Sequence, residues 1–267
     1  MPRNPLPRLA PLRTPSLALA LLVLAGCGGG GGGDDGEVLG ARASLVSLEQ
    51  AVFDGSRYDY GALGAIHQIT ITGAPDDADA SRWAMLHDGT TYRLYCMRLG
   101  DDTTLYQFGF NGSSYEYGYN SIPQIDITGT PPGADPSSIA MLHDGADFRL
   151  YMRDRGDPAD LHQFAFNAST GDYEYAYRSI PRIGTTNLPA DADLGRWAML
   201  YDGSVYRQYV AQAGSATTLY QFGFDGRSYE LGYRAIPEID VVNMPSAGTR
   251  FAMAYGQDRY HFYHLSR

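Results

Sequence analysis

Apolar and polar residues alternate along most of the chain after residue 47, with the period of two that is typical of half-buried β-strands. The segments 106–110 and 114–119 both alternate in this way, and Asn111-Gly112 stands between them. An Asn-Gly or Asp-Gly pair between two alternating segments is a strong sequence signal for a β-hairpin. The pattern therefore predicts a chain of antiparallel hairpins rather than helices.

The pattern also repeats, at an interval of about 56 residues. Residues 121–125, Ser-Ile-Pro-Gln-Ile, return in similar form at 179–183 and 235–239, and a degenerate copy stands at 65–69. The series begins with a second half-unit, at Leu48, and ends with a first half-unit. An open solenoid needs polar caps at its ends, whereas a closed ring lets the last hairpin pair with the first.

The expected fold is therefore all-β: a four-bladed β-propeller with four antiparallel strands per blade, closed by a strand swap between the N- and C-terminal half-units. We expect this domain to span 47–267. Two-residue turns would place Gln107 opposite Glu116, a structural cross-strand hydrogen bond that recurs in each copy. The aromatic face of the same hairpin, from Tyr106 to Tyr117, is expected in the core, with a sugar-stacking platform as the alternative.

The repeat units resemble hemopexin-like repeats. The resemblance is carried by Ala84 to Tyr95, with their Asp-Gly pair, and by Leu105 to Phe110, with Ile-Pro-x-Ile as the connector. These units are longer, Tyr106-Gln107 replaces the third-strand Tyr-Trp of that family, and the sequence lacks the terminal disulfide. The resemblance implies a propeller that acts as a binding module, in some cases with an ion in its central channel. A tachylectin-like propeller is the alternative.

The first residues look like an export signal. Three arginines precede an apolar run at 17–25 that is too short to span a bilayer. The run ends in Leu24-Ala25-Gly26-Cys27, which resembles the lipobox of bacterial lipoproteins. The resemblance implies removal of residues 1–26 as a signal peptide and acylation of Cys27. An ordinary secretory signal is the alternative.

Residues 27–46 include six consecutive glycines and are expected to form a flexible tether behind the lipidated cysteine. Gly28, directly after that cysteine, favours the outer membrane. We therefore expect an exported, lipid-anchored protein at the bacterial outer membrane or cell surface. With Cys27 acylated, Cys96 has no partner for an intramolecular disulfide, so we interpret it as a small buried residue.

Charge and motif content narrow the functional classes. The chain carries 20 Arg, no Lys and 30 Asp plus Glu, for a net charge of −10. This balance argues against nucleic acid and against electrostatic binding to anionic membranes, both of which require basic side chains. The sequence contains no nucleophile elbow, phosphate-binding loop or zinc motif. His261 and His264 are expected on opposite faces of one strand, which makes them a poor metal pair.

The candidate ligand-binding residues lie in loops. The loops between hairpins differ from copy to copy although the strands hardly change, as expected where a scaffold carries function on its loops. Connectors at the same end of the ring add three recurring aspartates, which could bind Ca²⁺ or, in the interpretation that we favour, cap turns. The candidates are Asp101, Asp102, Arg153, Asp154, Arg155, Asp79, Asp135 and Asp193.

Together these observations predict a lipid-anchored, monomeric binding or adhesion module at the cell envelope, which recognises a protein or a glycan and is not an enzyme. No cofactor is expected, apart from a cation that backbone carbonyls of the central channel could hold. Two alternatives stay open. One is a glycosidase or lyase with paired carboxylates at one end of the ring, and the other is a structural subunit of an envelope complex.

Overall fold

The computed structural model describes residues 47–244 and 250–265. These residues form twenty β-strands and no helix, which confirms the all-β expectation for them. Since they contain no helix, they also contain none that is long and apolar enough to cross a membrane. The predicted signal peptide, Cys27 and the glycine-rich tether lie outside the described residues.

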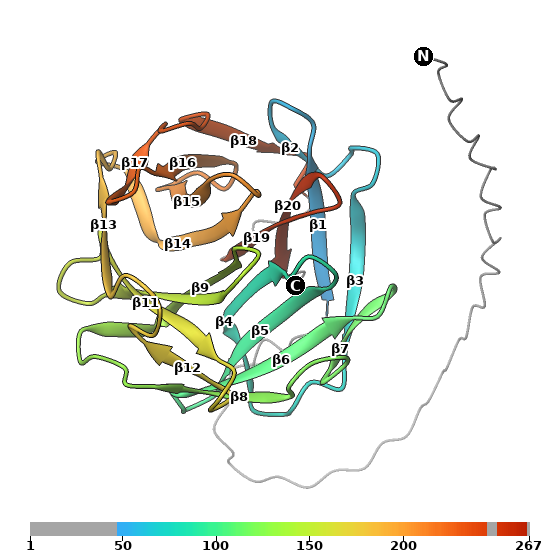
Figure 1. Cartoon of the computed structure of the whole chain (residues 1–267). Helices are drawn as coiled ribbons and strands as arrows, with labels where there is room; N and C mark the ends of the chain where they lie inside the picture. The colour runs from blue at the N-terminus through green and yellow to red at the C-terminus, as the bar shows by residue number, and fades with distance from the viewer. Residues whose placement is uncertain (1–46, 245–249, 266–267) are drawn as a thin grey trace, which may run out of the picture. The chain divides into compact units, whose positions relative to one another are not determined.

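The strands form four antiparallel units arranged in a ring (Figure 1). The first unit contains β4 (Ala78–His87), β5 (Tyr92–Arg98), β6 (Thr104–Phe110), β7 (Ser114–Tyr117) and β8 (Gln124–Thr128). The second contains β9 (Ala134–His143), β10 (Phe148–Asp154), β11 (Asp160–Asn167), β12 (Asp172–Tyr175) and β13 (Arg182–Thr186). The third contains β14 (Ala192–Tyr201), β15 (Tyr206–Gln212), β16 (Thr218–Phe224), β17 (Ser228–Leu231) and β18 (Glu238–Val242).

The fourth unit is assembled from both ends of the described chain. Its strands are β19 (Phe251–Gly256), β20 (Arg259–Leu265), β1 (Ser47–Phe53), β2 (Tyr58–Asp59) and β3 (Ile66–Thr72). β20 pairs with β1 in antiparallel fashion, with Tyr263 opposite Gln50. The expected closure by two half-units is therefore confirmed. The first strands of the four units, β4, β9, β14 and β19, surround the centre of the ring and pack against one another (Figure 1).

The outer edge of each unit differs from the expectation of four strands. In the first unit both β7 and β8 pair with β6, one with each half of that strand, so the fourth strand is split in two. β7 also pairs in parallel with β3 of the preceding unit, and β8 with β12 of the next unit. The Ile-Pro-x-Ile segment expected as a connector therefore belongs to this outer edge and joins neighbouring units.

The register of the β6–β7 hairpin also differs from the prediction. Gly109, and not Gln107, lies opposite Glu116, because the two central turn residues are 112–113 and not 111–112. A Cβ at Gly109 would collide with the backbone carbonyl of Tyr119, so this position favours glycine. The predicted Gln107–Glu116 hydrogen bond was therefore wrong.

The apolar core lies at the junctions between units. Each of four clusters of buried side chains takes its members from two neighbouring units. Phe108 and Tyr115, from the predicted aromatic stripe, are almost completely buried, and so is Cys96. Burying one large apolar side chain contributes about 1.5–3 kcal/mol, so apolar packing between units is a main source of stability. The core assignments of the aromatic stripe and of Cys96 are confirmed.

Candidate functional site

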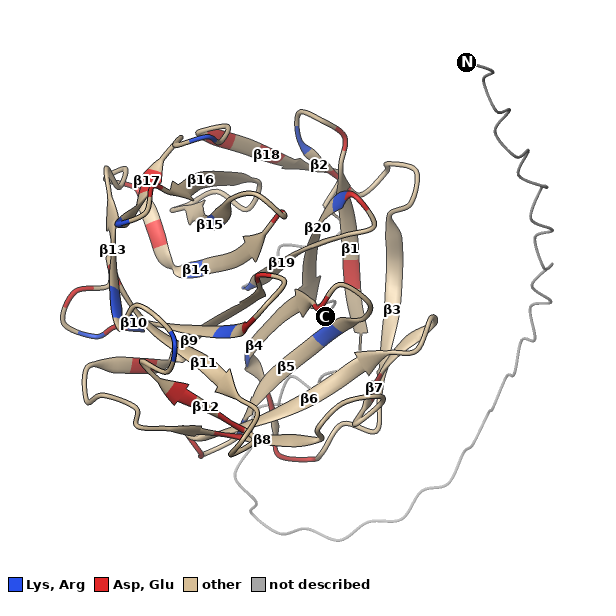
Figure 2. Ribbon diagram, viewed as in Figure 1, with Lys and Arg blue, Asp and Glu red and all other residues tan. Residues whose placement is uncertain are grey.

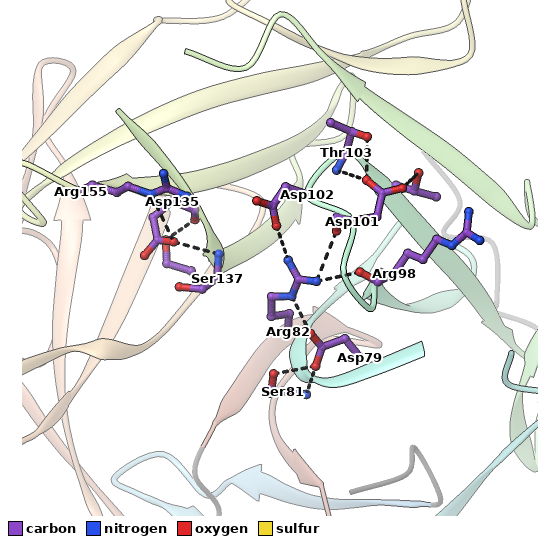
Figure 3. Close-up of polar contacts among 12 residues, drawn as sticks. Asp79, Ser81, Arg82, Arg98, Asp101, Asp102, Thr103, Asp135, Ser137 and Arg155 are labelled. Atoms are coloured by element: carbon purple, nitrogen blue, oxygen red, sulfur yellow. Dashed lines mark hydrogen bonds and ion pairs between the residues drawn. The ribbon is translucent and has the colours of Figure 1, made fainter. Parts of the chain in front are cut away.

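One end of the ring carries the loops that the sequence analysis selected. We call it the loop end: it consists of the β5–β6, β10–β11 and β15–β16 loops and of the connectors that lead into β4, β9 and β14. Arg82 lies at the centre of its contacts in the first unit (Figure 3). The Arg82 Nε donates to an Asp79 carboxylate oxygen at 2.6 Å, and Nη1 donates to Asp102 at 2.7 Å. Nη2 donates to the backbone carbonyls of Arg98 and Asp101.

The predicted aspartates at the loop end cap their own turns. In each of Asp79, Asp135 and Asp193 one carboxylate oxygen accepts a hydrogen bond from the backbone N–H two residues later. Asp101 and Asp154 make the same local bond. This arrangement is an Asx-turn, which holds a loop through its own backbone. The capping interpretation of the connector aspartates is therefore confirmed.

Arg153 is buried, in contrast to the loop position expected for it. Only 3% of the residue is exposed, and its guanidinium carbon lies 4.3 Å from the centre of the Trp197 ring. Its Nη1 donates to the carbonyl of Pro158 at 2.5 Å. Burial lowers the pKa of Arg153 to about 9, although the charge of Asp193 opposes this shift. Arg153 therefore packs inside the ring and joins the second unit to the third.

The neighbours of Arg153 are paired with other side chains. The Nε2 of His162 lies 2.9 Å from a carboxylate oxygen of Asp154, and the Nε of Arg155 lies 3.9 Å from Asp135. Acidic and basic residues are interspersed around the whole ring (Figure 2). The predicted residues thus meet in small clusters of mixed charge and not in one acidic surface. Ligand binding at the loop end stays a prediction.

Three cavities with matching walls lie between neighbouring units, near the opposite ends of the central strands. Pocket A, between the first and second units, measures about 260 Å³; pocket B, between the second and third, about 340 Å³; and pocket C, between the third and fourth, about 170 Å³. Each takes an arginine, a tyrosine, a glutamine and an isoleucine from one unit and aromatic side chains from the next. These residues are Arg93, Tyr95, Gln107, Ile122, Phe148, Phe166 and Tyr173 in pocket A, Arg149, Tyr151, Gln163, Ile180, Tyr206, Phe224 and Tyr229 in pocket B, and Arg207, Tyr209, Gln221, Ile236, Tyr260, Phe53 and Tyr58 in pocket C.

Each arginine is positioned by an aspartate of the turn before it. The Arg93 Nε donates to Asp88 at 2.5 Å, and the same bond recurs in the pairs Arg149–Asp144 and Arg207–Asp202. The aspartates also accept hydrogen bonds from the backbone of their own turns. Because one carboxylate fixes both the turn and the guanidinium, the arginine enters each pocket in a defined orientation.

The buried glutamines connect the pocket walls. The Gln107 side chain donates to the Tyr95 hydroxyl at 2.5 Å and accepts from the backbone N–H of Ile122 at 3.1 Å. Gln163 and Gln221 make the same two bonds in pockets B and C. In pocket C the hydroxyls of Tyr209 and Tyr58 lie 3.3 Å apart across the junction. The glutamines therefore fix the pocket floor, and this is the structural role that they have in place of the predicted pairs.

An exposed isoleucine stands at the mouth of each pocket. Ile122, Ile180 and Ile236 are 44%, 44% and 43% exposed, although each follows a segment that could have turned it inward. A single exposed apolar residue is common on protein surfaces. Recurrence at the same place beside a cavity points instead to a contact surface.

The fourth junction, where the fourth unit meets the first, is built differently. His261 occupies the position of the pocket arginines, and Gly256 occupies that of their aspartates. The Gln50 side chain is hydrogen-bonded to the His261 ring, and the Tyr92 hydroxyl is buried without a partner among the described residues. Burial lowers the pKa of His261 to about 4, so this ring is neutral at physiological pH. The fourth junction therefore lacks the guanidinium donor of the other three.

The central channel is narrow and lined by apolar side chains at its middle. Trp83, Ile139, Trp197 and Phe251 and the residues that follow them form its wall. Within the described ranges, no three His, Cys, Asp or Glu side chains are grouped as they would be to hold a metal ion. A cation held by backbone carbonyls in the channel stays a prediction.

The sequence analysis did not find the pockets. Arg93 and Phe148 face each other across pocket A although they are far apart in the sequence. One signal was present, because Asp88 and Arg93, Asp144 and Arg149, and Asp202 and Arg207 recur at the same spacing of five. Such pairs read in isolation look like ordinary turn contacts, and only the packing of one unit on the next turns them into pocket walls.

No protein-family model and no curated protein matches the chain. Solved structures give distant matches. The *Aleuria aurantia* lectin in complex with Fucα1-6GlcNAc is 14% identical, with a TM-score of 0.35 over 79% of this chain and 60% of that one. AofleA from Arthrobotrys oligospora is 15% identical, with a TM-score of 0.39 over 83% of this chain and 66% of that one.

A further structure, described as a fungal lectin with a six-bladed β-propeller fold and a novel fucose recognition mode, is 16% identical. Its TM-score is 0.31, over 65% of this chain and 50% of that one. The chain thus spans between 50% and 66% of the length of these three proteins. The function proposed below rests on the residues of this chain.

Proposed function

We propose that this protein is a non-catalytic binding module that recognises a glycan. The observation that carries the proposal is the recurrence of one set of pocket walls at three junctions of the ring. Catalysis usually needs one asymmetric site, whereas a ligand that is itself repetitive is met best by several equal sites. The recurrence therefore favours binding over the alternative of a glycosidase or lyase.

The chemistry of the walls supports a glycan more than a protein. Each pocket combines aromatic rings with a guanidinium and an exposed isoleucine. A saccharide ring presents C–H faces that pack on aromatic side chains and hydroxyls that accept hydrogen bonds, so one residue of a glycan can use both kinds of wall. The cavities are small, and a single sugar residue or short branch suits them.

We also infer that the ring is a four-bladed β-propeller. The support is the set of four antiparallel units, their first strands packed around one centre, and the pairing of β1 with β20. A ring of this kind presents its junctions at regular intervals. Its three pockets would meet three neighbouring copies of a sugar on one surface, which raises the overall affinity without any new contact.

The proposed setting is the bacterial cell envelope. It is supported by the lipobox-like Leu24-Ala25-Gly26-Cys27 and by the glycine run that follows. A lipid on Cys27 and the tether at 27–46 would hold the ring at the surface of the outer membrane as a monomer. The net charge of −10 is consistent with a ligand that is neutral or cationic.

The test is a glycan array read with three forms of the protein. One variant replaces Ile122, Ile180 and Ile236 by Ser at the three pocket mouths; these side chains are exposed, so the fold should tolerate the change. The matched control changes Asp102→Ser and Arg155→Ser at the loop end. We expect wild type and the control to bind the same glycans and the isoleucine variant to lose them. Loss confined to the loop-end variant would instead assign binding to the face predicted from the sequence.

A further inference from the structure

The three pockets are not equivalent, because pocket A lacks one hydroxyl. In pocket B the Tyr206 hydroxyl donates to Asp144 at 3.0 Å, and in pocket C the Tyr260 hydroxyl donates to Asp202 at 2.9 Å. Phe148 occupies this position in pocket A. No hydroxyl from the second unit therefore reaches the Asp88–Arg93 pair, and this side of the pair faces the cavity.

Arg93 consequently has a free donor. Its Nε binds Asp88 and its Nη1 binds the carbonyl of Asn120, while Nη2 has no hydrogen-bond partner among the described residues. In pocket B the Nη2 of Arg149 is bound to Asp147 at 3.2 Å. In pocket C the Tyr260 hydroxyl contacts Arg207 as well as Asp202. The guanidinium of pocket A is the one best able to donate to a ligand.

The charge of that guanidinium is already balanced. The Asp88 side chain is only 6% exposed and lies 2.5 Å from Arg93. Burial alone would raise the pKa of Asp88, but hydrogen bonds from Thr91, Thr90 and Arg93 lower it to about 2, so the carboxylate is ionised at neutral pH. A carboxylate ligand would meet Asp88 as well as Arg93, whereas an uncharged oxygen accepts the free N–H without repulsion.

The remaining walls of pocket A are apolar. Phe148 and Phe166 come from the second unit, and Ile122 stands half-exposed at the mouth. The cavity of about 260 Å³ is smaller than the roughly 300–1,000 Å³ of sites for drug-sized ligands. It therefore suits one ring with an apolar face and a few hydroxyls.

We propose that pocket A is the principal binding site and holds one uncharged saccharide residue, with a hydroxyl oxygen accepting from Arg93 Nη2 and a C–H face packed on Phe148 and Ile122. This assignment rests on the proposed glycan-binding function and adds the ligand class and the primary site to it. Pockets B and C are secondary sites that add avidity.

The experiment measures binding of methyl glycosides by saturation-transfer NMR and calorimetry, with the full-length protein in a detergent free of sugar head groups. The probes are methyl glycosides of neutral hexoses and deoxyhexoses, the matching hexuronic acids, and N-acetyl-leucine amide as an apolar peptide probe. The variants are Arg93→Gln and Phe148→Tyr in pocket A, with Arg207→Gln as the matched control in pocket C. Thermal unfolding of Arg93→Gln and Arg207→Gln should match, because both arginines hold the same kind of turn.

We expect a neutral glycoside to bind, and Arg93→Gln to weaken it about tenfold or more, which corresponds to about 1.4 kcal/mol. Phe148→Tyr should also weaken binding, because the new hydroxyl can engage Asp88 and Arg93, while Arg207→Gln should retain most of the affinity. Unchanged affinity in Arg93→Gln, or tighter binding of a hexuronide or of the peptide probe, would overturn the assignment but leave a binding function in place. Binding of none of the probes to wild type, together with an empty glycan array, would overturn the proposed function as well.

Discussion

At the scale of single residues, the turn aspartates do the most work for their size. Asp202 accepts hydrogen bonds from the backbone N–H groups of Ser204 and Val205, binds Arg207 at 2.5 Å, and accepts from the Tyr260 hydroxyl of the next unit. One carboxylate thus shapes a turn, orients a pocket arginine and joins two units. Only 3% of its side chain is exposed, so loss of its charge leaves several donors unsatisfied.

The first prediction follows from the ionisation of Asp202. Burial opposes the charged form, but hydrogen bonds from Val205, Ser204 and Arg207 lower its pKa from 3.8 to about 2. A pKa lower in the folded than in the unfolded state gives a contribution that is complete above about pH 4 and lost as the pH falls towards 2. Asp202→Asn should therefore lose about 1–3 kcal/mol at pH 7 and show a flatter fall in stability between pH 4 and 2.

Urea unfolding at pH 7, 4 and 2.5 measures this effect. Asp225→Asn is the control, because Asp225 caps an exposed turn and binds no arginine. Equal losses in the two variants at pH 7 would show that the contacts of Asp202 with Arg207 and Tyr260 contribute little.

At the scale of elements, close approach of the backbone decides which residues the third strand of a unit accepts. A Cβ at Gly109 would collide with the carbonyl of Tyr119, and one at Gly223 with the carbonyl of Tyr233. In the second unit the equivalent residue is Ala165, which is fully buried. The repeats therefore share a topology but differ in the distance between the third strand and the segment that crosses it.

The second prediction tests this close approach. Gly109→Ala should destabilise the domain by about 1–3 kcal/mol, because the carbonyl it meets is backbone and cannot rotate away. Ala165→Gly is the control and should cost only about 0.5–1 kcal/mol. Denaturant midpoints at constant slope compare the two. A stable Gly109→Ala variant would mean that the segment around Tyr119 shifts freely.

At the scale of the whole molecule, closure of the ring depends on both ends of the described chain. β20 lies between β19 and β1, so the fourth unit exists only when the two half-units meet. The fourth unit also packs on the first and the third through shared apolar clusters. Damage to one unit is therefore transmitted to its neighbours, in contrast to an open repeat protein.

The third prediction concerns this closure. Deletion of residues 251–267 removes β19 and β20 and should unfold the entire domain, because it exposes one edge of β1 and two apolar faces. A circular permutant with the old ends joined by a glycine linker and new ends in the 98–104 loop keeps every strand and should fold. Cooperative unfolding of the deletion variant at an almost unchanged midpoint would show that the units are independent.

The fourth prediction concerns the proposed lipid anchor. Cys27→Ser should leave the chain unprocessed or release it from the membrane fraction, because two or more acyl chains are needed for stable attachment. Detergent-phase partitioning of wild type and variant measures this directly. Ala25→Gly is the control, since it keeps the cysteine. Equal partitioning of Cys27→Ser and wild type would contradict the anchor.

How much of this protein could be read from the sequence depends on the range of the interactions involved. The period of two, the Asp-Gly turns and the phase of the repeats are local or repetitive signals, and they predicted the strands, the four units and the closure by two half-units. The register of the hairpins could not be read, because Asn111 accepts hydrogen bonds from the backbone of Ser113 and Ser114 and thereby lies outside the two-residue turn. Cys27 and the loop-end ligand site stay predictions. The pockets were decided by the tertiary structure alone, because Arg93 and Phe148 become neighbours only when the second unit packs against the first.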